Sequence, residues 1–264
     1  MRLVTPQSDL FSEPSSAETI ALVSDALEAR PEFQPAKPPR LTSVTHCHIS
    51  RQSLDINLPW GRTERLALEG YMEELPPSVT TVSFHISRDF VSAEIDARGR
   101  YVRGETPVSL GQMFENCEAN TSWIRSGFKG KILFENNNFY DTGCYEIATD
   151  PQTIATLVKT YADGLLLDFA HADVSAWNRG LDLADYLEPL LSCNIPQVHV
   201  SQPSFLYGGE ATDSHLVPSD EYWAKILDFL GEGFVKNLDV TVEHYIQVDA
   251  LVSFLVKVKK EWPS

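Results

Sequence analysis

The segments KILFEN at residues 131–136 and GLLLDFA at residues 164–170 decide the predicted fold. Both are short aliphatic runs, which are typical of strands buried on both faces. Between them, PQTIATLVKTYADG at residues 151–164 has apolar residues three and four positions apart, which predicts a helix. Asp150 and Pro151 favour a helix start at that point. The stretch therefore predicts two parallel strands joined by a helix.

The same alternation extends in both directions along the chain. Further strands are predicted at residues 2–6, 41–49, 80–86, 196–202 and 238–244, and further helices at 18–30, 182–191, 219–233 and 248–262. These make seven strands, and an eighth would fall between residues 203 and 218, where a polar stretch with two adjacent glycines predicts a loop. We expect one domain over residues 1–264, an α/β fold of the (β/α)8 TIM-barrel type that is irregular or partly open around its seventh strand.

The composition limits the classes of function. The chain has 264 residues, enough for a barrel, which takes about 250. Hydrophobic residues make up 43% and charged residues 22%, as in globular proteins. The net charge of −16 argues against broad binding of nucleic-acid phosphates. No apolar run approaches the length of a membrane span. From the net charge we expect no nucleic acid among the partners, and from the short apolar runs no membrane.

The cysteines and the N-terminus predict a cytoplasmic location. The segment MRLVTPQSDLFSEPSS lacks the basic and apolar regions of a signal peptide. Cys47, Cys117, Cys144 and Cys193 are scattered and form no CxxC pair. A secreted disulfide framework would be denser, so we expect four reduced thiols and no disulfide.

Histidines and carboxylates gather at the ends of the predicted strands and in the loop before the last one. The set contains all seven histidines, which are His46, His48, His85, His171, His199, His215 and His244. Its carboxylates are Glu135, Asp168, Asp213 and Glu243. In a parallel barrel the carboxyl ends of the strands converge on one mouth. Imidazoles and carboxylates bind zinc, manganese and non-haem iron. So many donors exceed the needs of one ion and predict a site for two or three.

Some of these residues also fit a purely structural role. A single histidine or aspartate at a strand end is more often a hydrogen-bonded structural residue than a ligand. His244 alternates with Glu243 and is expected to point away from the mouth. His46 and His48 share one face, so both could enter the mouth or one could support the other. No G-x-S-x-G, G-x-G-x-x-G or P-loop motif is present, which argues against the corresponding hydrolases and nucleotide-binding proteins.

At these same residues the sequence resembles a known family. LLLDFAHADVSAWNRG at residues 165–180 is similar to the LLLD-x-N-N-x-x-V-S-x-x-N-x-G signature of the multinuclear non-haem iron-dependent oxidases. Shorter segments resemble others of that family in the same order: SFH at 83–85, FENNNFY at 134–140, QVHVSQP at 197–203, DSH at 213–215 and TVEH at 241–244. The resemblance implies a xylose-isomerase-like TIM barrel with two or three iron ions. It also implies O2-dependent modification of a cysteine in a ribosomally made precursor peptide, helped by a small leader-binding companion protein.

The resemblance also implies a role for each matching residue. Glu135 would bridge two irons, of which one is held by His85 with His46 or His48. Asp168, His199 and Glu243 would hold the other, and His171, Asp213 and His215 a third. Of these residues we expect Glu135, His85 and Asp168 to take part in catalysis. The chain departs from the family at His171, where Asn is usual, and at Phe84, where Glu is usual.

Two other classes of function use the same residues. A zinc- or manganese-dependent hydrolase or sugar isomerase on the same barrel would act through a metal-activated water or by clamping an enediolate. Such a hydrolase could be an endonuclease that cuts nucleic acid, but the net charge of −16 disfavours binding of that substrate. A non-catalytic member would bind only metal or peptide.

Overall fold

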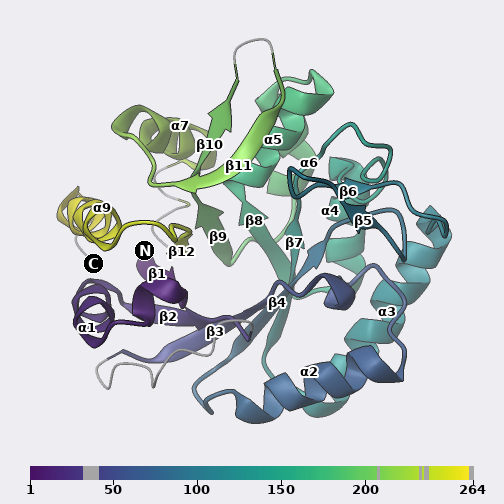
Figure 1. Ribbon diagram of the computed structural model, residues 1–264, viewed down its shortest axis with the longest axis horizontal. Coiled ribbons are helices and arrows are strands. Elements are labelled where there is room, and N and C mark those ends of the chain that lie inside the picture. Colours follow the sequence, from purple (N-terminus) through teal and green to yellow (C-terminus); the bar gives the residue numbers. More distant parts are fainter. Residues whose placement is uncertain (32–41, 207–208, 232–233, 235–237, 262–264) are drawn as a thin grey trace.

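The computed structural model describes residues 1–31, 42–206, 209–231, 234 and 238–261. Eight parallel strands close into a barrel in the order β1-β12-β9-β8-β7-β4-β3-β2 (Figure 1). Their bounds are β1 Arg2–Pro6, β2 Ala26–Ala29, β3 Val44–Ile49, β4 Thr81–Ile86, β7 Lys131–Asn136, β8 Gly164–Asp168, β9 Gln197–Val200 and β12 Asp239–Val242. The predicted TIM-type barrel is thereby confirmed.

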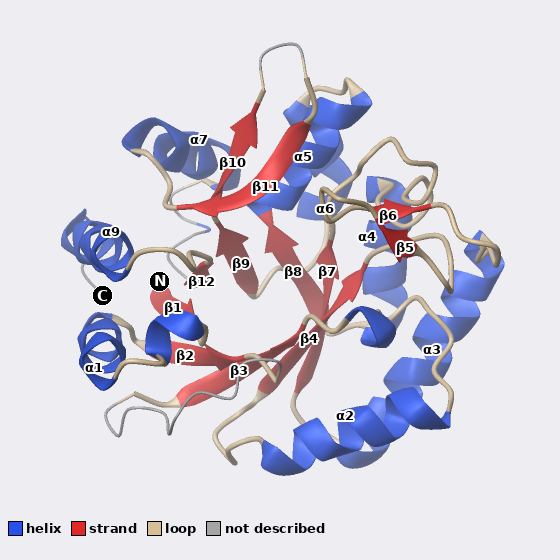
Figure 2. Cartoon of the chain, in the orientation of Figure 1, coloured by secondary structure: helices blue, strands red, loops and turns tan. Residues whose placement is uncertain are grey.

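Helices surround the barrel (Figure 2). Their bounds are α1 Pro14–Val23, α2 Arg62–Glu74, α3 Leu110–Gly127, α4 Pro151–Tyr161, α5 Phe169–Arg179, α6 Leu183–Leu191, α7 Asp220–Leu230 and α9 Val248–Glu261, with short 3-10 turns η1 at Asp9–Phe11 and η2 at Gln52–Leu54. The caps follow the sequence: Asp150 accepts from the Thr153 amide at α4, and Ser219 accepts from the Tyr222 amide at α7. Helices α1 and α9 pack against each other and bring the two ends of the chain together.

The eighth strand, which was not predicted from the sequence, lies near the amino terminus. Helix α1 ends at Val23, and Ala26–Ala29 forms β2, so the predicted helix over residues 18–30 is wrong in its second half. The sequence ALEA is made of helix-forming residues. Pairing with β1 on one side and β3 on the other overrides this preference, because the chain there completes the barrel.

The barrel is also not open at residues 203–218. This stretch contributes an antiparallel pair, β10 Gln202–Phe205 and β11 Ala211–Leu216, which lies outside the barrel between β9 and α7. The irregularity around the seventh strand is therefore an inserted hairpin and not a gap. A second small hairpin pairs β5 Glu94–Ile95 with β6 Tyr101–Val102. Residues 41, 232, 233 and 262, at the ends of predicted elements, lie outside the described residues.

The apolar core lies between the barrel strands and the helices. Strands β7 and β8 are buried on both faces, as their aliphatic sequences predicted. Cys47, Cys117, Cys144 and Cys193 form no disulfide with one another, and all are buried. No helix among the described residues has the length and apolar character needed to cross a bilayer.

The register of the strands determines where the polar residues meet. His85 on β4 lies opposite Glu135 on β7, and Asp168 on β8 lies opposite His199 on β9. All four of these residues stand at or next to the last position of their strand, and Glu243 follows β12 directly. The side chains therefore converge at the carboxyl end of the barrel.

Candidate metal centre

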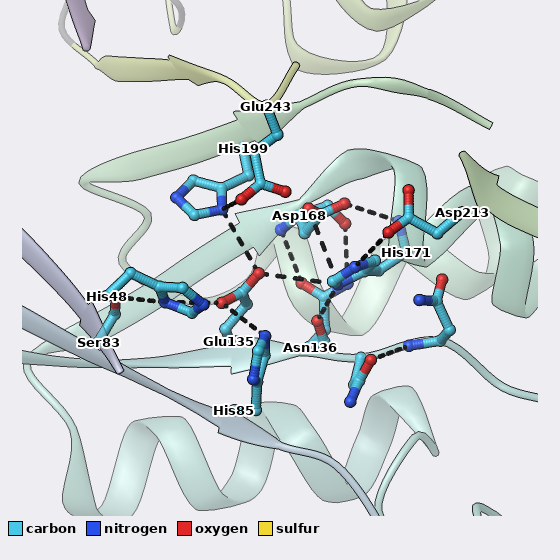
Figure 3. Close-up of polar contacts among 12 residues, drawn as sticks. His48, Ser83, His85, Glu135, Asn136, Asp168, His171, His199, Asp213 and Glu243 are labelled. Carbon is cyan, nitrogen blue, oxygen red and sulfur yellow. Dashed lines mark hydrogen bonds and ion pairs between the residues drawn. The ribbon is translucent and has the colours of Figure 1, made fainter. Parts of the chain in front are cut away.

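Glu135 lies at the middle of the polar cluster (Figure 3). Its Oε2 atom is 3.2 Å from Nδ1 of His48 and 3.3 Å from Nε2 of His85. Its Oε1 atom is 3.5 Å from Nδ1 of His199 and 3.7 Å from Nδ1 of His171. The carboxylate is buried, and each of its two oxygens faces a different pair of imidazoles.

The donors beside Glu135 form two groups of metal-binding size. One consists of His48, His85 and Glu135, and the other of Glu135, Asp168 and His199; within each group the donor atoms lie within 4.8 Å of one another. Glu243 adjoins the second group, because its Oε1 atom is 3.2 Å from Nδ1 of His199. Glu135 therefore belongs to both groups.

A third group lies beside them and includes two residues of β11. His171 donates from Nδ1 to the Asn136 carbonyl at 2.9 Å, which leaves Nε2 to face Asp213 Oδ2 at 3.3 Å. His215 places Nε2 3.1 Å from the same oxygen and 3.5 Å from Glu243 Oε2. The backbone of His215 has a φ of 46°, a left-handed conformation that costs about 1–3 kcal/mol for a non-glycine residue. This strained position directs the ring towards Asp213.

The pKa shifts show how the imidazoles and carboxylates of the cluster act on one another. Burial would lower the pKa of His199, but Glu28, Glu243 and Glu135 raise it well above its ordinary value. Burial would likewise lower the pKa of His171, but Asp168 and Asp213 raise it well above the ordinary value. Protons on these rings therefore compensate the buried carboxylates.

The pKa values of His48 and His85, whose rings face Oε2 of Glu135, shift in the opposite direction. Burial lowers the pKa of His48 to about 3 and outweighs the nearby Glu135 carboxylate. Burial also lowers the pKa of His85. Both rings are neutral at pH 7 and keep a nitrogen lone pair for a cation. Burial and the carboxylates of Glu243 and Glu135 together raise the pKa of Asp168 to about 7, against the opposing effect of His171.

The donor set fits bound cations. Several buried polar atoms of the cluster have no hydrogen-bond partner among the described residues: Glu28 Oε1, Glu135 Oε2, Asp168 Oδ2, Gln197 Oε1 and His199 Nδ1. Such atoms are costly to bury unless they are paired or bind a cation. Imidazole nitrogens and carboxylate oxygens without thiolates suit zinc, manganese and non-haem iron. Three adjoining groups are more than one ion needs.

The structure brings together all of the predicted ligands except His46. His46 is two residues before His48 on β3 and points to the same side, but it lies one layer deeper in the barrel. There its Nε2 atom is 3.1 Å from Asp239 Oδ2, and Asp239 also binds Arg2. The expectation that His46 could be a ligand is therefore corrected, because its ring already pairs with a carboxylate at the amino end of the barrel. His244 also lies outside the groups: its Nδ1 contacts the His215 carbonyl at 2.8 Å, and its Nε2 accepts from an amide at 3.1 Å.

Three residues of the site were not predicted. Glu28 is completely buried beside His199, and Arg30 forms an ion pair with Glu243. Tyr245 donates to Glu243 Oε1 at 2.8 Å, and its ring lies 5.1 Å from the Arg30 guanidinium. Glu28 and Arg30 were missed because residues 18–30 resemble a helix. Recognising β2 would have placed Glu28 in the barrel, whereas nothing in the sequence marks Tyr245.

Comparisons with known proteins agree on the fold. No protein-family model matches the sequence, and no curated protein matches it significantly. Endonuclease IV from Thermus thermophilus has a similar structure, with a TM-score of 0.61 and 15% identity over 99% of this chain and 98% of that one. A protein from Rhodospirillum rubrum assigned as a xylose isomerase is similar, with a TM-score of 0.60 and 11% identity over 98% of this chain and 99% of that one. The chain thus has a TIM barrel similar to those of these two proteins, with groups of residues that could hold a metal ion.

Proposed function

We propose that this chain is a multinuclear non-haem iron oxidase that uses O2 to modify a cysteine of a ribosomally made peptide. The observation that carries the proposal is the position of Glu135 between two sets of donors, His48 with His85 on one side and Asp168 with His199 on the other. A buried carboxylate with donors facing both of its oxygens suits a bridging ligand. The motifs at residues 165–180 and 134–140 support the same family.

Bound iron would supply redox chemistry towards O2 and a binding position for the cysteine thiolate. The protein supplies the geometry and the charge balance around that position. Arg30 compensates Glu243, and the Asn136 carbonyl fixes the ring of His171 so that Nε2 faces Asp213. The buried surroundings exclude bulk water, which strengthens each of these interactions.

The exposure of the donor side chains supports an approach route for the peptide. The side chains of His215 and His85 are 32% and 16% exposed, whereas that of Glu135 is 1% exposed. We place the entry of the cysteine on the side where His85 and His215 meet solvent. The precursor peptide and a small leader-binding companion protein are part of the proposal, as is a cytoplasmic location.

A zinc- or manganese-dependent hydrolase or isomerase is the second candidate. The same imidazoles and carboxylates bind those ions. The two proteins of similar fold are named as an endonuclease and a xylose isomerase, which suits this candidate as well as the first. The net charge of −16 disfavours a nucleic-acid substrate.

Metal analysis combined with an oxygen-uptake assay tests the proposal. The chain is purified without added metal, and its iron, zinc and manganese are counted per chain. O2 uptake is then measured with short cysteine-bearing peptides encoded beside its gene, with and without any small companion protein encoded there. Iron together with uptake that needs the peptide cysteine supports the oxidase. Zinc or manganese without uptake favours the second candidate, and a chain without metal or turnover is a binding protein.

A further inference from the structure

His199 contacts carboxylates through both of its ring nitrogens. Nδ1 faces Glu135 and Glu243, as described above. On the opposite side of the ring, Nε2 is 3.1 Å from Oε2 of Glu28. His199 and Glu28 are both completely buried, so no water competes for these contacts. The two edges of the ring therefore differ in function: Nδ1 meets the metal groups, whereas Nε2 meets the Glu28 carboxylate, with Nε2 of Gln197 3.3 Å away.

Glu28 is itself held by Gln197 of β9 and by Arg30, which directly follows β2. Gln197 on β9 donates from Nε2 to Glu28 Oε2 at 2.7 Å and to Thr241 Oγ1 on β12 at 3.0 Å. Arg30 lies on the other side of the carboxylate, with Nε 3.9 Å from Glu28 Oε1. The Gln197 amide must point this way, because the opposite orientation would place its oxygen against a carboxylate oxygen. The position of Glu28 is thus set before any ligand binds.

We propose that Glu28 is a positioning residue that holds the proton of His199 on Nε2 and so presents Nδ1 as the metal-binding nitrogen. The inference rests on the proposed metal function. A carboxylate can only accept, so the nitrogen that faces it must carry the hydrogen. A neutral imidazole has one protonated nitrogen, and the lone pair is then left on Nδ1, between Glu135 and Glu243. Carboxylates that orient a metal-bound histidine in this way raise its affinity for the ion.

A direct ligand role for Glu28 predicts different behaviour. Donor atoms of Glu28, His199 and Glu243 also lie within 4.8 Å of one another, so Glu28 must be tested as a ligand too. Both hydrogen bonds to Glu28 converge on Oε2. Glu28→Gln therefore keeps an oxygen that can accept both bonds while it loses the charge, whereas Glu28→Ala loses both. A positioning role makes Glu28→Gln the milder change, but a ligand role makes the two variants similar.

The test uses zinc as a diamagnetic probe and measures binding and protonation without any turnover. Zinc affinity is measured for the wild type, Glu28→Gln and Glu28→Ala, together with 15N and 1H NMR of the labelled His199 ring. We expect Glu28→Ala to lower the zinc affinity about 10–100-fold and to expose the Nε2 proton to rapid exchange. Glu28→Gln is expected to keep the slowly exchanging Nε2 proton and most of the affinity.

Asp239→Asn is the matched control. Asp239 also pairs a buried histidine in the barrel, His46 at 3.1 Å, but at the end opposite the site. We expect this variant to be less stable than the wild type and to bind zinc as tightly. If Asp239→Asn weakened zinc binding as much as Glu28→Ala does, the effect would be general destabilisation, and the positioning role would be overturned.

Two further results would overturn the inference. One is a Glu28→Ala chain with wild-type zinc affinity and an unchanged His199 spectrum. The other is a Glu28→Gln chain that loses a whole zinc ion, as Glu28→Ala would if Glu28 were a ligand. A wild-type chain that binds zinc but catalyses no iron-dependent oxidation would count against the oxidase and leave the role of Glu28 standing. A wild-type chain that binds no divalent ion would overturn both.

Discussion

Glu135 and His199 face each other inside the barrel, with Oε1 of the carboxylate 3.5 Å from Nδ1 of the imidazole. They come from β7 and β9, which are separated by β8 in the sheet, so the contact crosses the interior. Burial would raise the pKa of Glu135, but the imidazoles of His48, His85 and His199 lower it below its ordinary value. The same two atoms that make an ion pair without metal are donors for a cation, which links protonation to metal binding.

Glu135→Ala is expected to remove the metal from both groups that share this carboxylate. A bridging carboxylate supplies charge to both cations, and the adjacent Asn136 and Asn137 are neutral. The ions of both groups should be lost, which leaves at most the ion of the third group, and turnover should be lost. Metal counting and O2 uptake measure the two effects, and Asp239→Asn, which lies at the other end of the barrel, should leave both unchanged. If Glu135→Ala retained two ions in these groups, the result would contradict the assignment of Glu135 as a bridging ligand.

His171→Asn is expected to lower metal content and turnover less than Glu135→Ala does. Its Nε2 atom faces Asp213, and its Nδ1 atom is occupied by the Asn136 carbonyl, so the ring serves the third group. Asn is a weaker neutral donor at the same position. The variant should keep two ions and at least part of the activity. If His171→Asn lost all metal while Glu135→Ala kept it, the roles assigned to these residues would be inverted.

Metal binding is expected to release protons near pH 7. Burial opposes protonation of His171, His199 and His215, but the surrounding carboxylates raise all three pKa values above the ordinary one. A ligand nitrogen must be deprotonated, so up to about three protons per chain should leave on loading, one from each ring, and the affinity should increase as the pH rises. Calorimetry in two buffers of different ionisation enthalpy measures this number. Binding enthalpies that are the same in both buffers would show that the rings bind no protons in the metal-free state.

Asp239 is expected to make stability depend on pH in the acid range. Burial would raise its pKa, but hydrogen bonds from His46 and Arg2 lower it to about 2 from an ordinary value of 3.8. Its folded-state pKa is thus the lower one, so the stabilisation is complete above about pH 4 and is lost as the pH falls towards 2. Asp239→Asn should cost about 1–2 kcal/mol at pH 6, a modest value because Arg2 is partly exposed.

Urea unfolding of the wild type and Asp239→Asn at pH 6 and pH 3 measures this dependence. The difference between the two proteins should shrink at pH 3, because there the carboxylate of the unfolded wild type binds a proton that the folded carboxylate does not yet bind. A difference that grows as the pH falls would contradict the lowered pKa.

Much of the barrel could be predicted because parallel strands buried on both faces are aliphatic throughout. ILFE and LLLD each end in a carboxylate, and the convergence of strand ends then predicts that Glu135 and Asp168 meet. Strand β2 could not be predicted in this way, since Ala26–Ala29 consists of helix formers whose state depends on pairing with β1 and β3. Because β2 was not predicted, Glu28 was not recognised as a residue of the site.

Periodicity predicts the face of a residue but not its depth. His46 and His48 share a face, and only the register of β3 against its neighbours places His48 beside Glu135 and His46 beside Asp239. Similarly, the polar stretch around Asp213 predicts a loop. Its pairing with β10 in a hairpin depends on contacts that the local sequence does not contain.

The central claim is that this barrel holds a cluster of iron ions around Glu135. The most direct measurement is reconstitution of the chain with 57Fe under anaerobic conditions, followed by iron counting and Mössbauer spectroscopy. We expect at least two irons per chain with the spectrum of magnetically coupled ions, and loss of that coupling in Glu135→Ala. A chain that binds zinc or manganese but no coupled iron, or a coupled spectrum that persists in Glu135→Ala, would contradict the central claim.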